Sequence, residues 1–174
     1  MKADSSVRYG TVSRYLHWGM AVLIAWQMMK FFDRIGDGEH WVGQVLASWH
    51  VSIGTLLLLL AIGRIAWAGK QRNRRPAPAP ATAWLVKAGH ALLYLAMAVL
   101  PITGIMVLVG NGFGLAAFGI PLVAPGTDIA WMAELGGRLH SPVAWLLLIM
   151  VACHIGMAFF HYFVKKDGVL QRMA

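Results

Sequence analysis

Seven histidines stand in a chain that is otherwise mostly apolar, and they are the residues with the clearest capacity for chemistry. An imidazole can ligate a metal ion, exchange a proton near neutral pH or donate a hydrogen bond. Ionisable side chains in apolar surroundings are costly and usually face a cofactor, a partner or water. Metal ligation and proton exchange are therefore the chemistries that this composition predicts.

The spacing of His140 and His154 predicts two cofactor layers. The two residues are fourteen positions apart, which is about 21 Å along a helix and about 40° short of whole turns. One helix therefore presents a histidine near each of its ends. We expect His50 to meet His140 in one layer, and either His17 or His90 to meet His154 in the other.

Small side chains lie one helical turn after four of the histidines. A porphyrin is a flat, wide plate, so a helical histidine that reaches its iron should have a small side chain at position i+4. The small residues are Ala21 after His17, Gly54 after His50, Ala144 after His140 and Ala158 after His154, whereas Gln44, Tyr94 and Lys165 follow His40, His90 and His161. The pattern favours His17 over His90 as a ligand, although small residues also serve plain helix packing in membranes.

Ligand type favours haem over other occupants. A structural zinc site needs four clustered ligands, whereas these histidines come as separated pairs without a carboxylate in the helices. Two axial histidines fill both open positions of a haem iron, which suits electron transfer. The lone cysteine, Cys153, does not form the C-x-x-C-H attachment motif of a c-type haem. The sequence therefore predicts two b-type haems.

Three further polar residues lie beside the layer that contains His154. Arg64 is either a snorkelling arginine or a partner for a haem propionate. His161 follows His154 by seven residues, about 10 Å further along the same stripe. A quinone carbonyl needs a hydrogen-bond donor and a route for protons. His161 and His90 are therefore candidate quinone residues, and the alternative is that each anchors a helix at the interface.

Four apolar stretches can position these side chains. A helix that crosses about 30 Å of hydrocarbon needs roughly 20 mostly apolar residues. The 174 residues are 59% hydrophobic and 13% charged, too apolar for a soluble domain. We predict an all-α membrane protein, a single domain over residues 1–174 that forms a four-transmembrane-helix bundle. The helices are expected at about 10–34, 44–69, 82–109 and 138–165, with the first retained rather than cleaved as a signal peptide.

The formal charge of +8 indicates topology rather than nucleic-acid binding. Twelve of the 15 Lys and Arg residues lie near the two termini or the link between the second and third helices. Only Lys30, Arg34 and Arg138 lie on the opposite side. The positive-inside rule then places both termini in the cytoplasm, with attraction to anionic membrane lipid as a secondary effect. His40 is expected in a solvated loop on the outer side.

Prolines and glycines divide the connecting segments. Residues 72–80 combine arginines with alternating prolines, which predicts a basic patch followed by a stiff spacer. In the outer loop, residues 128–139 are expected to form a short amphipathic helix at the interface. Pro101 should bend the third helix. Pro142 is compatible with a fourth helix that starts at His140 itself.

The sequence resembles the bacterial cytochrome b561 family along nearly its whole length. The resemblance rests on short motifs around the histidines. They are Leu16-His17-Trp18, His50-Val51-Ser52-Ile53-Gly54 with Arg64, Gly89-His90-Ala91, Leu93-Tyr94-Leu95, Leu139-His140, Cys153-His154, His161-Tyr162-Phe163 and Lys166-Asp167.

This resemblance implies a site assignment and an activity. It implies an outer haem held by His50 and His140, an inner haem held by His17 and His154, and a quinone site near the inner haem. Some members of the family behave as superoxide:ubiquinone oxidoreductases. A bacterial origin further implies the inner (cytoplasmic) membrane. The sequence carries no signal for an oligomeric state.

Three classes of function compete at this point. The first is an oxidoreductase that oxidises superoxide at the outer face and reduces ubiquinone. The second is a non-catalytic relay subunit that links a periplasmic or membrane redox partner to the quinone pool. The third is a transporter that uses histidines for protons or metal, which is disfavoured because broken-helix repeats and carboxylates within the helices are missing.

Overall fold

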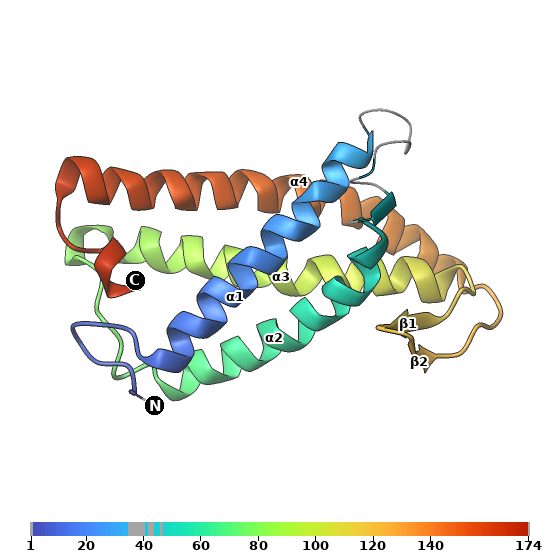
Figure 1. Cartoon of the computed structure of the whole chain (residues 1–174), viewed down its shortest axis with the longest axis horizontal. Coiled ribbons are helices and arrows are strands. Elements are labelled where there is room, and N and C mark those ends of the chain that lie inside the picture. Colours follow the sequence, from blue (N-terminus) through green and yellow to red (C-terminus); the bar gives the residue numbers. More distant parts are fainter. Residues whose placement is uncertain (1, 35–40, 42–43, 46, 174) are drawn as a thin grey trace.

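Four α-helices form the frame of the computed structural model, which describes residues 2–34, 41, 44–45 and 47–173. They are α1 (Thr11–Met28), α2 (His50–Lys70), α3 (Ala83–Gly110) and α4 (Ala130–Phe160). Helices α3 and α4 run side by side along the long axis, and α1 and α2 cross in front of them (Figure 1). The predicted four-helix architecture is therefore present, and the range that contains His40 falls outside the described residues.

Shorter elements connect the helices. They are the 3-10 segments η1 (Met29–Arg34), η3 (Ala47–Trp49), η4 (Pro80–Thr82) and η6 (Leu170–Arg172), and the π-helical segment η5 (His161–Lys165). Both chain termini lie at one end of the bundle, and the segment between α3 and α4 lies at the other (Figure 1). We call these the terminal end and the hairpin end.

A β-hairpin at the hairpin end departs from the all-helical expectation. Strand β1 (Leu115–Ala117) pairs with the antiparallel β2 (Ile120–Val123). The two residues between the strands, Phe118 and Gly119, have φ values of 53° and 78°. Positive φ at both central positions is what the type I′ turn of a two-residue hairpin loop requires. Because phenylalanine rarely adopts this conformation, the sequence offered little signal for the turn.

Helix α4 starts earlier than predicted. The expected short helix over residues 128–139 is the first part of one continuous helix, and the expected start near 138 or at His140 is wrong. Pro142 lies inside α4, where it removes the backbone donor that would pair with the carbonyl of Arg138. The loss of one bond is tolerated because the helix continues on both sides of it. The 31 residues span about 46 Å, more than a hydrocarbon core of about 30 Å.

Three segments among the described residues are long and apolar enough to cross a membrane. They are Ala47–Lys70, Pro80–Gly110 and Ala130–Lys165. The 18 residues of α1 include Arg14, His17 and Gln27, and α1 is not among these segments. Its mostly apolar side chains pack on α2. The predicted first span is thus a helix of the bundle, and its passage through the membrane stays a prediction.

The packed interior lies between α1 and α2. Met20 of α1 contacts Ile53, Leu57 and Ala61, which repeat every four residues along one face of α2. Many large apolar side chains elsewhere on the helices are exposed. An apolar exterior around a small packed core is the pattern of a bundle surrounded by lipid.

Glycines allow α3 and α4 to approach closely. A β-carbon at Gly136 would lie 2.7 Å from the carbonyl oxygen of Thr103, and one at Gly110 would overlap the backbone at Ala133. Small residues at such contacts are how membrane helices pack their backbones together. This contact fixes the register in which His140 faces α3.

Residues at the terminal end tie three segments of the chain together. The Asp4 side chain is fully buried, and it accepts hydrogen bonds from the Gly10 N–H and the Ser13 hydroxyl, both at 2.7 Å. Its second oxygen lies 3.2 Å from Nε of Arg75 in the link between α2 and α3. The Tyr9 N–H donates to the carbonyl of Arg172 in η6. The N-terminal segment therefore holds the link and the C-terminal segment in place.

Candidate functional site: two groups of facing histidines

His50 and His140 face each other at the hairpin end of the bundle. His50 is the first residue of α2, and His140 lies in the first half of α4. Their ring centroids are 6.0 Å apart, with an interplanar angle of 84°. Both line a cavity of about 430 Å³ between the four helices, together with Gln27, Lys30 and Ala144.

This separation suits two ligands of one metal ion. Imidazole nitrogens lie about 2 Å from a bound metal, so two imidazoles that held one ion from opposite sides would have ring centroids roughly 6 Å apart. Within the described residues no group of three or more His, Cys, Asp or Glu could hold an ion. A site that needs only two protein ligands, as a haem iron does, therefore fits the residues present.

Helix α3 holds the ring of His140. Its Nδ1 lies 3.1 Å from the carbonyl oxygen of Leu100 and 3.1 Å from the hydroxyl oxygen of Thr103, which itself donates to Leu100 at 2.8 Å. A carbonyl can only accept, so Nδ1 of His140 carries the proton and donates it. Nε2 of the neutral ring then keeps its lone pair, which is the form that binds a metal.

Two glycines make room beside this pair. A β-carbon at Gly104 would lie 3.0 Å from Cε1 of His140. A β-carbon at Gly54 would lie 3.2 Å from Nε2 of Gln27, which donates a hydrogen bond to the carbonyl of His50 at 2.8 Å. The small residue predicted after His50 thus meets Gln27 in the structure. The role of Gly104 was missed because it acts between two helices.

Three histidines gather further along the bundle. The ring of His154 lies 6.2 Å from that of His17 and 5.7 Å from that of His90, between centroids. The structure therefore brings both candidate partners of His154 together rather than one of them. His90 is exposed, whereas His17 and His154 are partly buried.

Arg64 joins this group from α2. One of its terminal nitrogens lies 3.1 Å from Nδ1 of His17, and its Nε donates to the hydroxyl of Tyr94 at 3.2 Å. His90 differs, because its Nδ1 contacts the carbonyl of Val86 at 2.7 Å, one turn earlier in α3. The guanidinium therefore supplies a positive charge directly beside this group of histidines.

His161 lies beyond this group at the terminal end. It is the first residue of η5, and its Nδ1 lies 2.6 Å from the carboxylate of Asp167. The contact shifts the pKa of Asp167 below its ordinary value, chiefly through this hydrogen bond. The sequence singled out His161 but not its partner, although the Lys166-Asp167 motif stood six residues further on.

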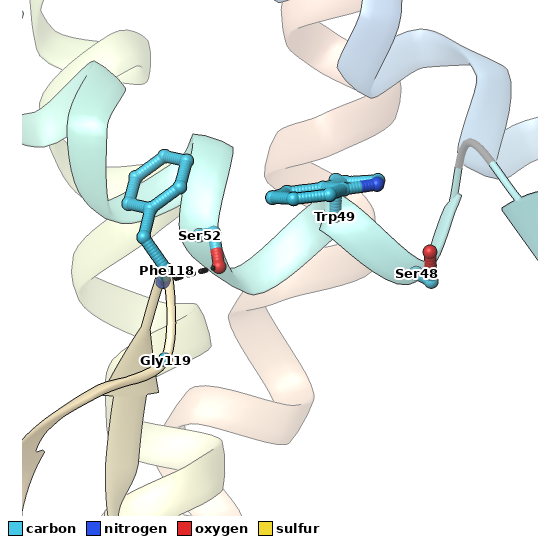
Figure 2. A pocket seen from close by; sticks show the side chains of 5 residues that line it. All are labelled: Ser48, Trp49, Ser52, Phe118 and Gly119. Atoms are coloured by element: carbon cyan, nitrogen blue, oxygen red, sulfur yellow. Dashed lines mark hydrogen bonds between the residues drawn. The ribbon is translucent and has the colours of Figure 1, made fainter.

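A second, open pocket of about 340 Å³ lies at the hairpin end, and Figure 2 shows its five lining residues. The N–H of Phe118 donates to the hydroxyl of Ser52 at 2.9 Å, which ties the hairpin tip to the first turn of α2. The rings of Trp49 and Phe118 lie 6.1 Å apart between centroids, and both are about half exposed. An exposed aromatic pair therefore borders the helix that starts with His50.

The cations predicted on the outer side are in different environments. Lys30 lines the cavity at the hairpin end. Arg138 lies 2.6 Å from Glu134, one turn earlier in α4, and both side chains are largely exposed. The side chain of Arg34 is outside the described part of the structure. Arg138 is thus partly neutralised.

A bundle of long apolar helices with facing histidines defines the class of protein, a membrane cytochrome. The chain belongs to the family described as prokaryotic cytochrome b561, which it matches over residues 8–174. Membership makes it a membrane electron-transfer protein and implies that it binds haem b.

Curated relatives agree over almost the full length. "Cytochrome b561 homolog 2" of Escherichia coli strain K12 is 31% identical, over 95% of this chain and 90% of the relative. "Cytochrome b561 homolog 1" of the same strain is 26% identical, over 95% and 96%. "Probable superoxide oxidase CybB" of Yersinia pestis is 29% identical, over 95% of both chains.

Proposed function

We propose that this protein holds two b haems and transfers electrons from the outer side of the membrane to ubiquinone, with superoxide as the electron donor. The observation that carries the proposal is the presence of facing histidines at two levels of one bundle. His50 and His140 would hold the outer haem, and His17 and His154 the inner haem. When bound, each haem supplies a one-electron carrier without an open position for oxygen.

His17 is preferred to His90 as the partner of His154 for two reasons. Ala21 follows His17 by one turn, whereas the bulkier Tyr94 follows His90. His17 is also less exposed than His90.

The contact between Arg64 and His17 would have to change when haem binds. A guanidinium can only donate, so Nδ1 of His17 accepts the hydrogen bond and the proton of the neutral ring is on Nε2. Arg64 would have to turn away so that the proton could move to Nδ1 and leave Nε2 free to act as a ligand. A haem propionate is the partner to which we assign Arg64.

The quinone site is assigned to the terminal end, beside the inner pair. His161 lies about two helical turns beyond His154, and His90 has its ring against that of His154. Each can donate a hydrogen bond from a ring N–H to a quinone carbonyl near the membrane interface. The apolar surfaces of α3 and α4 would accept the isoprenoid tail of the quinone.

The charge distribution supports a direction for the bundle in the inner membrane. The arginine-rich link and both termini lie at the same end (Figure 1). By the positive-inside rule this end faces the cytoplasm, and the hairpin end faces the periplasm. Lys30, Arg34 and Arg138 would then be the cations available to attract a small anion from outside.

The name of the Yersinia pestis relative favours superoxide as the donor. Rapid mixing of the haem-loaded protein with a superoxide source, with and without ubiquinone, tests the proposal. We expect fast haem reduction that ubiquinone reverses, and slower reduction with less dependence on ionic strength after neutralisation of Lys30, Arg34 and Arg138. Haem reduction no faster than background dismutation allows would overturn the superoxide assignment.

A relay subunit for a redox partner is the second candidate. The observation that favours it is the half-exposed aromatic pair, Trp49 and Phe118, next to His50 at the hairpin end (Figure 2). Aromatic residues are enriched at protein interfaces. The pairing of Arg138 with Glu134 also weakens the field that would attract superoxide. Failure of the superoxide reaction together with intact ubiquinone exchange would select this function.

A further inference from the structure

The chain reverses direction after His161 and brings Asp167 back against it. Helix α4 ends at Phe160 and passes into the π-helical turn η5. Lys166 then adopts a left-handed conformation with φ 51°, and Gly168 follows with φ 73°. A left-handed conformation is unfavourable for a residue other than glycine, and π-helical turns are often found at functional sites. This turn therefore has a cost that the His161–Asp167 contact helps to offset.

Both carboxylate oxygens of Asp167 are engaged. One lies 2.6 Å from Nδ1 of His161, and the other accepts the N–H of Val169 at 3.2 Å. A distance of 2.6 Å is short even for a charge-assisted hydrogen bond between a nitrogen and a carboxylate oxygen. Because an ionised carboxylate can only accept, the proton on this contact belongs to Nδ1 of His161. The low pKa of Asp167 keeps this arrangement throughout the neutral range.

Exposure increases from the histidine to the carboxylate. The side chain of His161 is 24% exposed and that of Asp167 is 38% exposed. Asp167 lies two residues beyond the apolar span that ends at Lys165. The neighbouring charge of Lys165 lies over the ring of Phe160, 6.0 Å from its centroid. Asp167 is thus at the aqueous edge, with His161 on its membrane side.

We infer that Asp167 is a positioning residue for quinone protonation, in that its carboxylate fixes the orientation of the His161 ring and stabilises the imidazolium whose Nε2–H gives a proton to a quinone oxygen. This inference rests on the proposed function, which supplies the quinone and its electrons. It adds a residue that acts through His161 rather than on the quinone. The same division of roles exists between the aspartate and the histidine of a catalytic triad.

The proton and electron balance is simple. Quinone takes two electrons from the protein's reduced haems and two protons from the aqueous side to become quinol. In each proton transfer an Nε2–H bond of the His161 imidazolium breaks and an O–H bond forms. The neutral ring keeps its Nδ1–H on Asp167 and regains a proton at Nε2 from water. Asp167 remains a carboxylate throughout.

The test measures reoxidation of the pre-reduced, haem-loaded full chain by a short-chain ubiquinone in stopped flow, with rates expressed per loaded haem. We expect Asp167→Asn to slow the maximal rate at least tenfold, with little change in the ubiquinone concentration that gives half the maximal rate. An asparagine carries no charge and can turn either its oxygen or its NH₂ toward Nδ1, so it neither stabilises the imidazolium nor fixes the ring. The effect of D₂O on the rate should also increase, because proton transfer becomes limiting.

Two further variants separate positioning from a structural role. Asp167→Glu should restore part of the rate because it keeps the carboxylate. Glu134→Gln removes a carboxylate from an exposed ion pair at the opposite end of the bundle and serves as the matched control. In a His161→Gln background, Asp167→Asn should cause no additional loss, because residues that act as a unit are not additive.

The outcomes distinguish this inference from the proposed function. No reoxidation of the unmodified protein by ubiquinone would overturn both. Normal reoxidation of the unmodified protein, with the same rate and the same D₂O effect in Asp167→Asn, would overturn the inference alone. An additional loss in the His161→Gln background would also overturn it, since Asp167 would then act without His161.

Discussion

At the scale of single residues, the histidines differ in how their second ring nitrogen is held. Nδ1 of His140 donates to Leu100 and Thr103 on another helix. Nδ1 of His50 is buried and has no partner in the described part of the chain. Because the partners of Nδ1 set the orientation and basicity of a ligating imidazole, the two sides of the outer pair are unequal. His140 is the better fixed of the two.

Replacement of Thr103 by valine tests this difference. The change keeps the shape of the side chain but removes the hydroxyl that lies 3.1 Å from Nδ1 of His140. The loss of one such bond costs about 0.5–1.5 kcal/mol, so haem at this pair should bind roughly two- to tenfold more weakly. Haem titration followed by absorbance measures the change. Thr55→Val is the control, because the Thr55 hydroxyl donates only within its own helix, to Val51; equal weakening in both variants would contradict the role of Thr103.

Gly104→Ala tests the space beside His140. The new methyl group would lie 3.0 Å from Cε1 of the ring, closer than a side chain and a ring ordinarily approach. The ring must therefore move, and we expect the outer haem to be lost while the spectrum of the inner haem survives. Gly63→Ala has open space around it and should keep both haems. Retention of the outer haem in Gly104→Ala would show that the ring adjusts without losing its ligand position.

The candidate histidines could be predicted from the sequence, but not the residues that hold them. Spacing along one helix placed His140 and His154 in separate layers because helical geometry is regular. Gly104 and Thr103 act on a histidine of a different helix, so no local pattern reveals them. The gathering of both His17 and His90 near His154 likewise depends on how the helices cross.

Among the connections between elements, the one at the terminal end depends on a single side chain, that of Asp4. We call the contacts of Asp4 with Gly10, Ser13 and Arg75 the cap. Asp4→Asn removes the charge that pairs with Arg75 and retains one oxygen for the Gly10 and Ser13 donors. Removing one partner of a buried, hydrogen-bonded pair leaves groups unsatisfied, which costs about 1–3 kcal/mol. We expect a lower melting temperature in detergent and faster proteolysis of the N-terminal segment.

The control for Asp4→Asn is Glu134→Gln, which breaks an exposed ion pair. Exposed pairs contribute between zero and about 1 kcal/mol, so the melting temperature should hardly change. If both variants melted alike and the N-terminal segment remained protected in Asp4→Asn, the cap would not depend on the buried carboxylate. The comparison uses the same chemical change in two different environments.

The helices α2, α3 and α4 could be predicted from apolar length because a membrane requires it, whereas α1 is not among the segments that are long and apolar enough. The hairpin and the true start of α4 could not. The turn places Phe118 at a positive φ that favours glycine, and Ser52 from α2 helps to hold it there. Pro142 suggested a helix start, but contacts between α3 and α4 around Gly110 and Gly136 stabilise the helix well before it. Tertiary packing therefore overrode both local signals.

At the scale of the whole molecule, the two histidine groups lie at successive levels between the hairpin end and the terminal end. His140 and His154 are about 21 Å apart along α4, which is regular over this range. His161 and Asp167 extend the series to the terminal edge. In the proposed function, electrons would have sites along most of an apolar layer that is about 30 Å thick, and protons would enter where the series ends.

The number of haems and the identity of the inner ligands can be tested together. A pyridine haemochrome assay on the purified, fully loaded protein should report two b haems per chain, because two separate histidine groups are present. His50→Ala and His140→Ala should each remove the same haem, and His17→Ala and His154→Ala the other.

His90→Ala should keep both haems and slow the reaction with ubiquinone, since Tyr94 would crowd a porphyrin beside His90. Its ring lies as near to His154 as that of His17 does, so this variant is the decisive one. Loss of a haem in His90→Ala with retention in His17→Ala would make His90 the inner ligand and would assign the Arg64–His17 contact to the quinone side.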